Sequence, residues 1–225
     1  MNSDLSLDFS SHGAELFKDA VKSQLPELDD ALAVLPRDEA GTRIHGVQRL
    51  EPFLANKGCI GAIAASLLGR VARPVRAVLF NKTPETNWSL AWHQDRTICV
   101  KAKCDAHGFG NWTTKRGLLH VEPPFELLSR MATLRVHLDD VPATNAPLLI
   151  APGSHVRGRI PMEKIGHTVQ TCGMETCLAE AGDIWAYSTP ILHSSEAASK
   201  PATRRVLQVD YAAEELPAGL EWLGV

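Results

Sequence analysis

The sequence contains no long hydrophobic run. In 225 residues, the longest uncharged apolar stretch is residues 58–69, which is 12 residues long, whereas a membrane-spanning helix needs roughly 20. Residues 1–5 hold neither a basic stretch nor the apolar segment of a secretion signal. We therefore predict a protein that works in the cytoplasm and has no membrane partner.

Positive charge is not in excess either. The chain has 23 Lys and Arg against 26 Asp and Glu, a formal net charge of −3 and a pI near 6.3. Nucleic-acid-binding proteins usually carry a strongly basic surface, so we predict no nucleic-acid partner. Hydrophobic residues make up 44% of the chain and charged residues 22%, an ordinary balance that excludes a disordered chain.

Cysteines are few and lack the close pairing of a metal or redox motif. The five cysteines are an odd number, and no two of them are separated by only two residues. They are typical of reduced thiols in a reducing compartment. The equal gaps in Cys99/Cys104 and Cys172/Cys177 leave a zinc site of four thiolates as an alternative.

The hydrophobic pattern divides the chain into a helical and a strand-rich part. Apolar residues at helical spacing before residue 36, and again over 59–68, predict helices in residues 1–73. That first stripe consists of Phe17, Val21, Leu25, Leu28, Leu32 and Leu35. Residues 74–212 alternate with period two, and residues 213–225 form a tail. Without repeats or low-complexity linkers, we predict one domain over 1–225, mainly β with N-terminal helices.

The strand-rich part contains several predicted strands and one long loop. The strands are expected over residues 75–80, 89–93, 131–138, 147–151, 183–187 and 204–211. In 131–138, Thr133, Arg135 and His137 share one face, which suggests a strand that lines a cavity. Residues 101–117 are polar and contain glycine, and we expect a loop there that either covers a substrate or is an exposed connection.

A His-x-Asp pattern on a strand points to metal chemistry. Residues i and i+2 project from the same face of a strand and can reach one ion. Two histidines and one carboxylate on one side of Fe(II) leave positions open for a cosubstrate and dioxygen. The candidates are His93/Asp95, His137/Asp139 and, as a His-x-Glu variant, His120/Glu122. Of these we favour His93/Asp95, because His120 precedes what reads as an exposed connection and Asp139 suits a turn.

A second histidine and an arginine follow near the C-terminus. His193 lies one hundred positions after His93, and Arg204 begins a predicted strand eleven residues later. A buried arginine binds a carboxylate through two parallel hydrogen bonds, so this pair suits a metal site that takes a dicarboxylate such as 2-oxoglutarate. The alternative is that Arg204 and Arg205 are a solvated pair on an edge strand.

Several segments together resemble the phytanoyl-CoA dioxygenase family, in its bacterial branch, over residues 75–212. They are 79–84 (LFNKTP), 92–95 (WHQD), 134–140, 147–155 with its closing Pro-Gly-Ser-His, Gly182-Asp183, and His193-Ser194-Ser195 with Arg204. The resemblance implies a double-stranded β-helix, which is a cupin-like jelly-roll barrel. One departure is Ser194, where the family usually has glycine.

The resemblance also implies a site. His93, Asp95 and His193 would bind Fe(II), and Arg204 would hold the far carboxylate of 2-oxoglutarate. Further candidates for cosubstrate contacts are Ser195, Arg135, Asn81 and Trp88.

From these residues we predict a dioxygenase that hydroxylates a small molecule and releases succinate and CO2. The intact Asp95 favours hydroxylation, because related halogenases replace this carboxylate. A small metabolite is favoured over an acyl-CoA, since no basic patch suits a CoA phosphate. The alternatives are a metal-binding jelly roll without turnover and a cupin-like isomerase or hydrolase with another ion.

Overall fold

The computed structural model describes residues 7–36, 39–217 and 219–225, and its largest element is a six-stranded antiparallel sheet. In spatial order its strands are β1 (Ala14–Phe17), β11 (Ile184–Ser188), β8 (Met131–His137), β13 (Arg204–Ala212), β3 (Arg73–Lys82) and β2 (Gly41–Ile44). Every pairing in it is antiparallel. Strands distant in sequence are thus neighbours, as a jelly roll requires.

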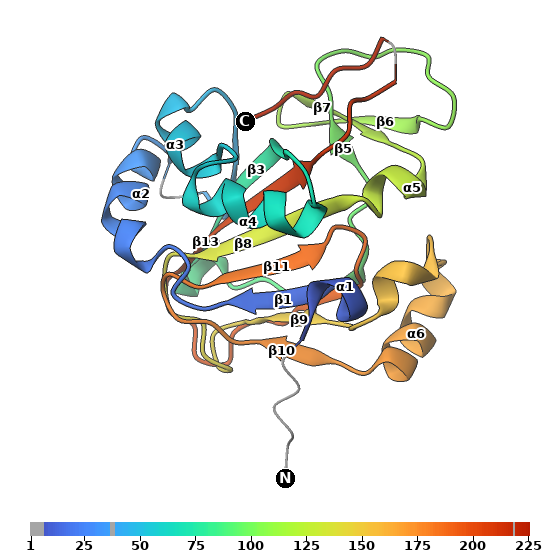
Figure 1. Cartoon of the computed structure of the whole chain (residues 1–225). Helices are drawn as coiled ribbons and strands as arrows, with labels where there is room; N and C mark the ends of the chain where they lie inside the picture. The colour runs from blue at the N-terminus through green and yellow to red at the C-terminus, as the bar shows by residue number, and fades with distance from the viewer. Residues whose placement is uncertain (1–6, 37–38, 218) are drawn as a thin grey trace.

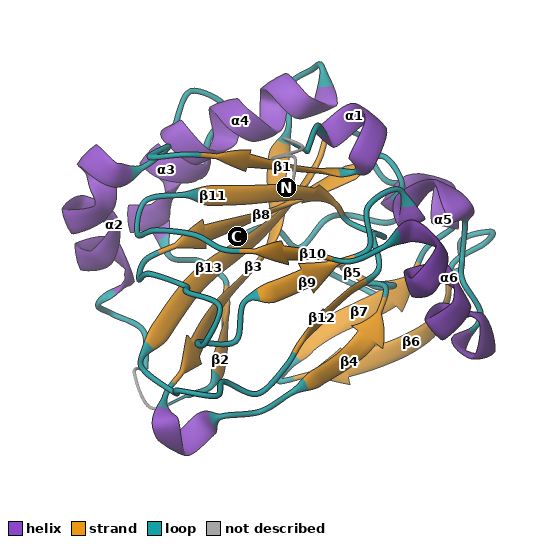
Figure 2. Ribbon diagram, turned by 90° about the horizontal axis from the view of Figure 1, so that it is seen from below, coloured by secondary structure: helices purple, strands orange, loops and turns teal. Residues whose placement is uncertain are grey.

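A four-stranded sheet faces the larger one (Figure 2). In order it contains β10 (Glu175–Cys177), β9 (Leu148–Ile150), β12 (His193–Ser195) and β4 (Leu90–His93). Leu148 and Ile150 of this sheet pack with Trp185 and Tyr187 of the larger one. The prediction of a mainly β double-stranded β-helix is confirmed. A closed barrel is not seen, since no strand pairing among the described residues joins the two sheets.

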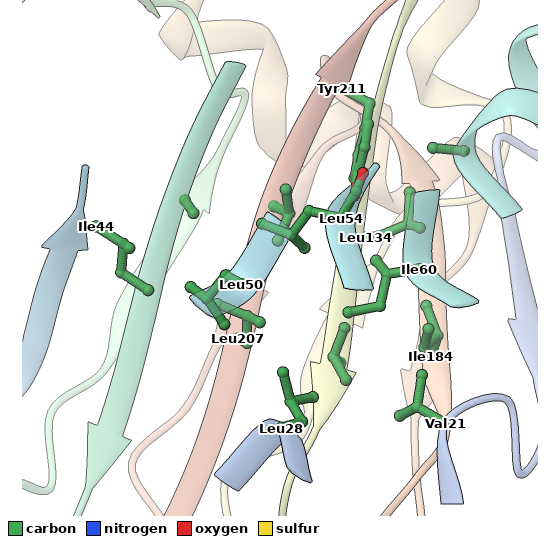
Figure 3. Close-up of a cluster of buried hydrophobic side chains, with 14 of the residues drawn as sticks. Val21, Leu28, Ile44, Leu50, Leu54, Ile60, Leu134, Ile184, Leu207 and Tyr211 are labelled. Atoms are coloured by element: carbon green, nitrogen blue, oxygen red, sulfur yellow. The ribbon is translucent and has the colours of Figure 1, made fainter. Parts of the chain in front are cut away.

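Helices cover the outer face of the larger sheet (Figure 1). The six α-helices of the described residues are α1 (Phe9–His12), α2 (Leu25–Leu32), α3 (Glu51–Leu54), α4 (Cys59–Leu68), α5 (Phe125–Leu128) and α6 (Ile165–Cys172). Figure 3 shows Leu28, Leu54 and Ile60 from this helical layer packed against Leu134 and Leu207 of the sheet. Burying each such side chain contributes about 2 kcal/mol. No described helix is both long and apolar enough to cross a membrane.

The helix predicted over 59–68 is confirmed as α4. Ile60 and Ala64 are fully buried on its inner face. Gly69 ends the helix with φ +67°, a conformation that glycine adopts without steric cost. α2 has Pro26 in its first turn, where the missing N–H of proline costs no intrahelical hydrogen bond.

The helical prediction for residues 1–73 is wrong for two short segments. Residues 14–17 form β1 at one edge of the larger sheet, and residues 41–44 form β2 at the other. Phe17 therefore belongs to a strand. Asp19, with φ +53°, separates β1 from the helical residues that follow, because an α-helix cannot continue through a left-handed residue.

The loop predicted over 101–117 is wrong in its second half. A small sheet contains β5 (Ile98–Cys99), β7 (Leu118–Glu122) and β6 (Gly110–Lys115), and β6 and β7 form a hairpin. The C-terminal tail packs against this sheet, since Leu220 and Trp222 are buried in one cluster with Ile98 and Val121. Figure 1 shows the C-terminal tail passing β5 and β7, with its end on the side of α3.

Candidate active site

Two adjacent strands bring His93 and His193 together. β4 ends with His93, β12 begins with His193, and the two residues are direct partners in the strand register. Their ring centroids are 4.2 Å apart. Strand pairing thus joins two side chains that are one hundred positions apart in sequence.

Backbone carbonyls orient both imidazole rings. His93 Nδ1 lies 2.8 Å from the carbonyl oxygen of Ala91, and His193 Nδ1 lies 3.0 Å from that of Ile191. A carbonyl can only accept, so each Nδ1 donates its proton and each Nε2 keeps a free lone pair. Metal-binding histidines are commonly fixed in this way.

Asp95 completes a group of three possible metal ligands. One ligand atom from each of His93, Asp95 and His193 lies within 4.8 Å of the others. Burial would raise the pKa of Asp95, but Arg76 and the two histidines hold it below its ordinary value. Burial lowers the pKa of His193 to about 4. A carboxylate and a neutral imidazole at neutral pH are the forms that a divalent ion needs.

Arg76 links Asp95 to a second buried carboxylate. Its Nη2 lies 3.5 Å from Asp95 Oδ2, and its Nε lies 2.8 Å from Asp210 Oδ2. Asp210 also accepts a hydrogen bond from Thr133. Arg76 is therefore occupied by two carboxylates, and its contacts limit how Asp95 can turn.

The other predicted metal sites, at His137/Asp139 and His120/Glu122, are not formed. Among the described residues, the only group of three suitable ligands is His93, Asp95 and His193. Asp139 accepts hydrogen bonds from Arg205 instead. His120 is buried on β7, with Nε2 3.1 Å from Cys99 Sγ, so the expected exposed connection there is wrong. All five cysteines are free thiols, and the four-thiolate zinc site is not formed.

A cavity of about 260 Å³ opens beside the three ligands. Lys82, Arg135 and Arg204 line it, and their exposed fractions are only 3%, 7% and 2%. Nε of Arg135 and Nε of Arg204 have no hydrogen-bond partner among the described residues. Buried polar groups are nearly always paired, so this end of the cavity is built to receive an acceptor.

The three cations repel one another. Burial, together with the charges of Arg204 and Arg135, lowers the pKa of Lys82 to about 8. Burial and Arg135 also lower the pKa of Arg204, which still remains charged at neutral pH. A bound carboxylate would relieve this repulsion through charge-assisted hydrogen bonds. The residues therefore fit a metal ion with a dicarboxylate at its side.

The sequence matches a model of one protein family over residues 47–206, and that family is described as phytanoyl-CoA dioxygenase. The match covers well over half of the chain. The protein belongs to the phytanoyl-CoA dioxygenase family. This membership supports the iron and 2-oxoglutarate predicted from the sequence, and it makes the chain a 2-oxoglutarate-dependent oxygenase by family. None of the curated protein sequences matches the chain.

Solved structures of similar fold include EctD, SnoN and HygX. EctD from S. alaskensis, in its apoform, is 17% identical with a TM-score of 0.65. The match covers 100% of this chain and 83% of the EctD chain. The epimerase SnoN from nogalamycin biosynthesis, with Fe3+ and alpha ketoglutarate, is 18% identical with a TM-score of 0.64. The match covers 91% of this chain and 80% of the SnoN chain. HygX from Streptomyces hygroscopicus, with nickel and 2-oxoglutarate, is 16% identical with a TM-score of 0.56. The match covers 91% of this chain and 84% of the HygX chain. At such identities the likeness establishes the fold.

Most of the other predicted site residues line the same cavity. Trp88, Ser194 and Ser195 do so together with Arg135 and Arg204. Arg204 is not the solvated residue of the alternative interpretation, whereas Arg205 pairs with Asp139 and Asp29 on the outside. Ser194 has no positive φ, so replacing the family's glycine there requires no strained backbone.

Asn81 does not line this cavity, which corrects the prediction that it contacts the cosubstrate. β3 continues through Lys82, whereas the strand was expected to end at residue 80. Because side chains alternate along a strand, Phe80 and Lys82 face the cavity and Asn81 faces a separate hollow with Asp139. Lys82 is thus the cavity residue that the sequence analysis missed. Its position two residues after Phe80 would place both side chains on the same face of a strand that continued through residue 82.

His137 is buried but lies outside the lining of the cavity. It is 1% exposed, and neither ring nitrogen has a hydrogen-bond partner among the described residues. Burial, together with Arg135 and Arg204, lowers its pKa to about 3. It is therefore a neutral imidazole behind the cation cluster.

Proposed function

We propose that this protein uses Fe(II), 2-oxoglutarate and dioxygen to hydroxylate a C–H bond of a small molecule, with release of succinate and CO2. The observation that carries the proposal is the two-histidine, one-carboxylate group beside a buried cluster of cations. These are the two halves of a site for a metal-chelating dicarboxylate.

Each half of the site has a defined role. His93, Asp95 and His193 would hold the metal, and Arg204 would bind the far carboxylate of 2-oxoglutarate, assisted by the charge of Arg135 and the hydroxyl of Ser195. When bound, Fe(II) and 2-oxoglutarate supply the oxidising chemistry. The protein orients the two ligands, keeps Asp95 ionised through Arg76, and excludes water from the cations.

Two features support hydroxylation in a reducing compartment. Asp95 keeps the carboxylate that halogenases of related type lack, which favours hydroxylation over halogenation. All five cysteines are free, and this suits the cytoplasm. Solved structures of similar fold include an epimerase and a carbocyclase, so an assay of this function identifies the substrate-derived product as well as succinate.

Succinate release from 2-oxoglutarate tests this function. We expect the iron-loaded protein to form succinate slowly without a substrate. Arg204→Gln should raise KM for 2-oxoglutarate by about 10-fold or more, since a hydrogen bond to a charged group contributes about 1.5–3 kcal/mol. The matched control is Arg205→Gln, which removes the neighbouring arginine outside the cavity and should leave this KM unchanged.

The contrary outcomes identify the alternatives. Metal binding without any succinate, with or without candidate substrates, would indicate a binding protein that lacks turnover. Activity on a substrate that survives Arg204→Gln with the same KM would instead indicate a cupin-like isomerase or hydrolase, which makes no demand on Arg204.

A further inference from the structure

Two further cations line the cavity at some distance from the cosubstrate end. Arg43 extends from β2, and Lys115 is the last residue of β6. Arg43 is the register partner of Val78, and directly paired residues in an antiparallel sheet project from the same face. Arg43 is half-buried and Lys115 is exposed, so the two cations lie where the cavity meets solvent.

Neither of these cations is neutralised by the protein. Among the residues that the structure describes, Arg43 and Lys115 form no ion pair and no side-chain hydrogen bond, whereas their neighbour Arg116 pairs with Glu39. Arg76 is occupied by Asp95 and Asp210. Burial lowers the pKa of Arg43, and Arg76 and Arg116 lower it further. Positive charge is thus concentrated here without a matching carboxylate.

The bound cofactor and cosubstrate would not use these two cations. Of the two carboxylates of 2-oxoglutarate, one belongs at the metal and the other at Arg204, where Arg135 and Lys82 already supply charge. The opening also offers an apolar wall, because Trp88 and Leu90 line the cavity and Leu90 is 48% exposed. Leu90 lies on β4, three residues before His93.

We propose that the prime substrate is an anion whose carboxylate or phosphate group binds Arg43 and Lys115. Its apolar part would lie along Leu90 and Trp88 and reach the metal ligands. The guanidinium fork of Arg43 suits either group, since both present two oxygens to it. This inference rests on the proposed function and narrows its substrate to one class.

Calorimetric titration of the nickel- and 2-oxoglutarate-loaded full chain tests this inference. The probes are hexanoate and hexyl phosphate, each compared with a neutral counterpart, hexanamide and hexanol. We expect at least one charged probe to bind about 10-fold or more tightly than its counterpart. Arg43→Gln should weaken the charged probe by about 10-fold, and Lys115→Gln by about 2- to 5-fold, because an ion pair of an exposed lysine is screened by solvent. Lys101→Gln, which removes an exposed lysine paired with Glu221, is the matched control and should change nothing.

Three results would overturn the inference. The first is equal binding of charged and neutral probes, and the second is unchanged binding in both cavity variants. The third is displacement of the charged probe by additional 2-oxoglutarate, which would show that the probe binds at Arg204. Because Lys115 is exposed, Lys115→Gln keeps the test valid if Arg43→Gln fails to fold. Succinate release by the same variants without substrate reports on the proposed function separately, so the failure of either one is distinguishable.

Discussion

At the scale of single residues, Lys82 has the most unusual environment of the cavity. Its Nζ donates to the carbonyl oxygen of Trp88 at 2.7 Å and lies 3.3 Å from both Ser195 Oγ and the carbonyl oxygen of Glu196. The ammonium also lies 4.7 Å from the centroid of the Trp88 ring. None of these partners is a carboxylate that would offset burial, which together with Arg204 and Arg135 lowers the pKa of Lys82 to about 8.

Lys82 should therefore make 2-oxoglutarate binding depend on pH. Its protonated form attracts the dianion, and that form is lost as the pH rises through about 8. We expect the affinity of the nickel-loaded protein for 2-oxoglutarate to fall between about pH 7 and about pH 9, and Lys82→Gln to flatten this fall. Lys101→Gln should keep the wild-type profile. An unchanged fall in Lys82→Gln would show that another group causes it.

The grouping of His93, Asp95 and His193 could be predicted from the sequence, and so could two of the three cavity cations, Arg204 and Arg135, but not Lys82. The His-x-Asp spacing and the later histidine of the family motif pointed to His93, Asp95 and His193, which the structure brings together. Lys82 comes from β3, a strand whose adjacency to β13 depends on the topology. Asn81 was predicted to contact the cosubstrate, but it lies on the face of β3 away from the cavity. Side chains alternate along a strand, so the face on which Asn81 lies depends on where the strand ends.

At the scale of elements, the turn before β11 ties the N-terminal segment to the sheet. Gly182 has φ +100°, and a Cβ at this position would lie 2.8 Å from the Cα of Lys22. Asp183 accepts hydrogen bonds from the backbone N–H groups of Asp19 and Glu180. The turn thus requires a residue without a side chain at position 182.

Gly182→Ala should lower the free energy of unfolding by about 2 kcal/mol, because alanine is strained at positive φ and would also contact Lys22. The control is Gly166→Ala in α6, where a Cβ meets nothing within 4 Å. That change should be neutral or stabilise the protein by about 0.5 kcal/mol. Urea unfolding measures both, and equal effects of the two substitutions would contradict the role given to the turn.

Long elements with a clear period were predictable, whereas several short strands, such as β1 and β2, were not. β8 and α4 both show a clear period and were predicted within one residue of their ends. β6 is mostly exposed along its length, so its sequence gives no alternation to recognise. The stripe that begins at Phe17 has helical spacing, but Asp19 interrupts the backbone there.

At the scale of the whole molecule, the two faces of the larger sheet have different roles: one packs in the main hydrophobic core, and the other lines the cavity. On β8, Leu134 and Val136 face the helical layer and belong to the main core, while Arg135 faces the cavity. The alternation of 131–138 was enough to predict these two faces. Which strands pair, and that the two sheets remain separate, depends on contacts between distant segments, which a local pattern does not contain.

The most direct test of a shared metal and 2-oxoglutarate site is the visible spectrum of the protein with Fe(II) and 2-oxoglutarate under anaerobic conditions. We predict a charge-transfer band that His93→Ala abolishes. His167→Ala, which removes an exposed histidine of α6, should keep it. A band that survives His93→Ala but disappears in His137→Ala would contradict the assignment and move the metal to the other His-x-Asp pair.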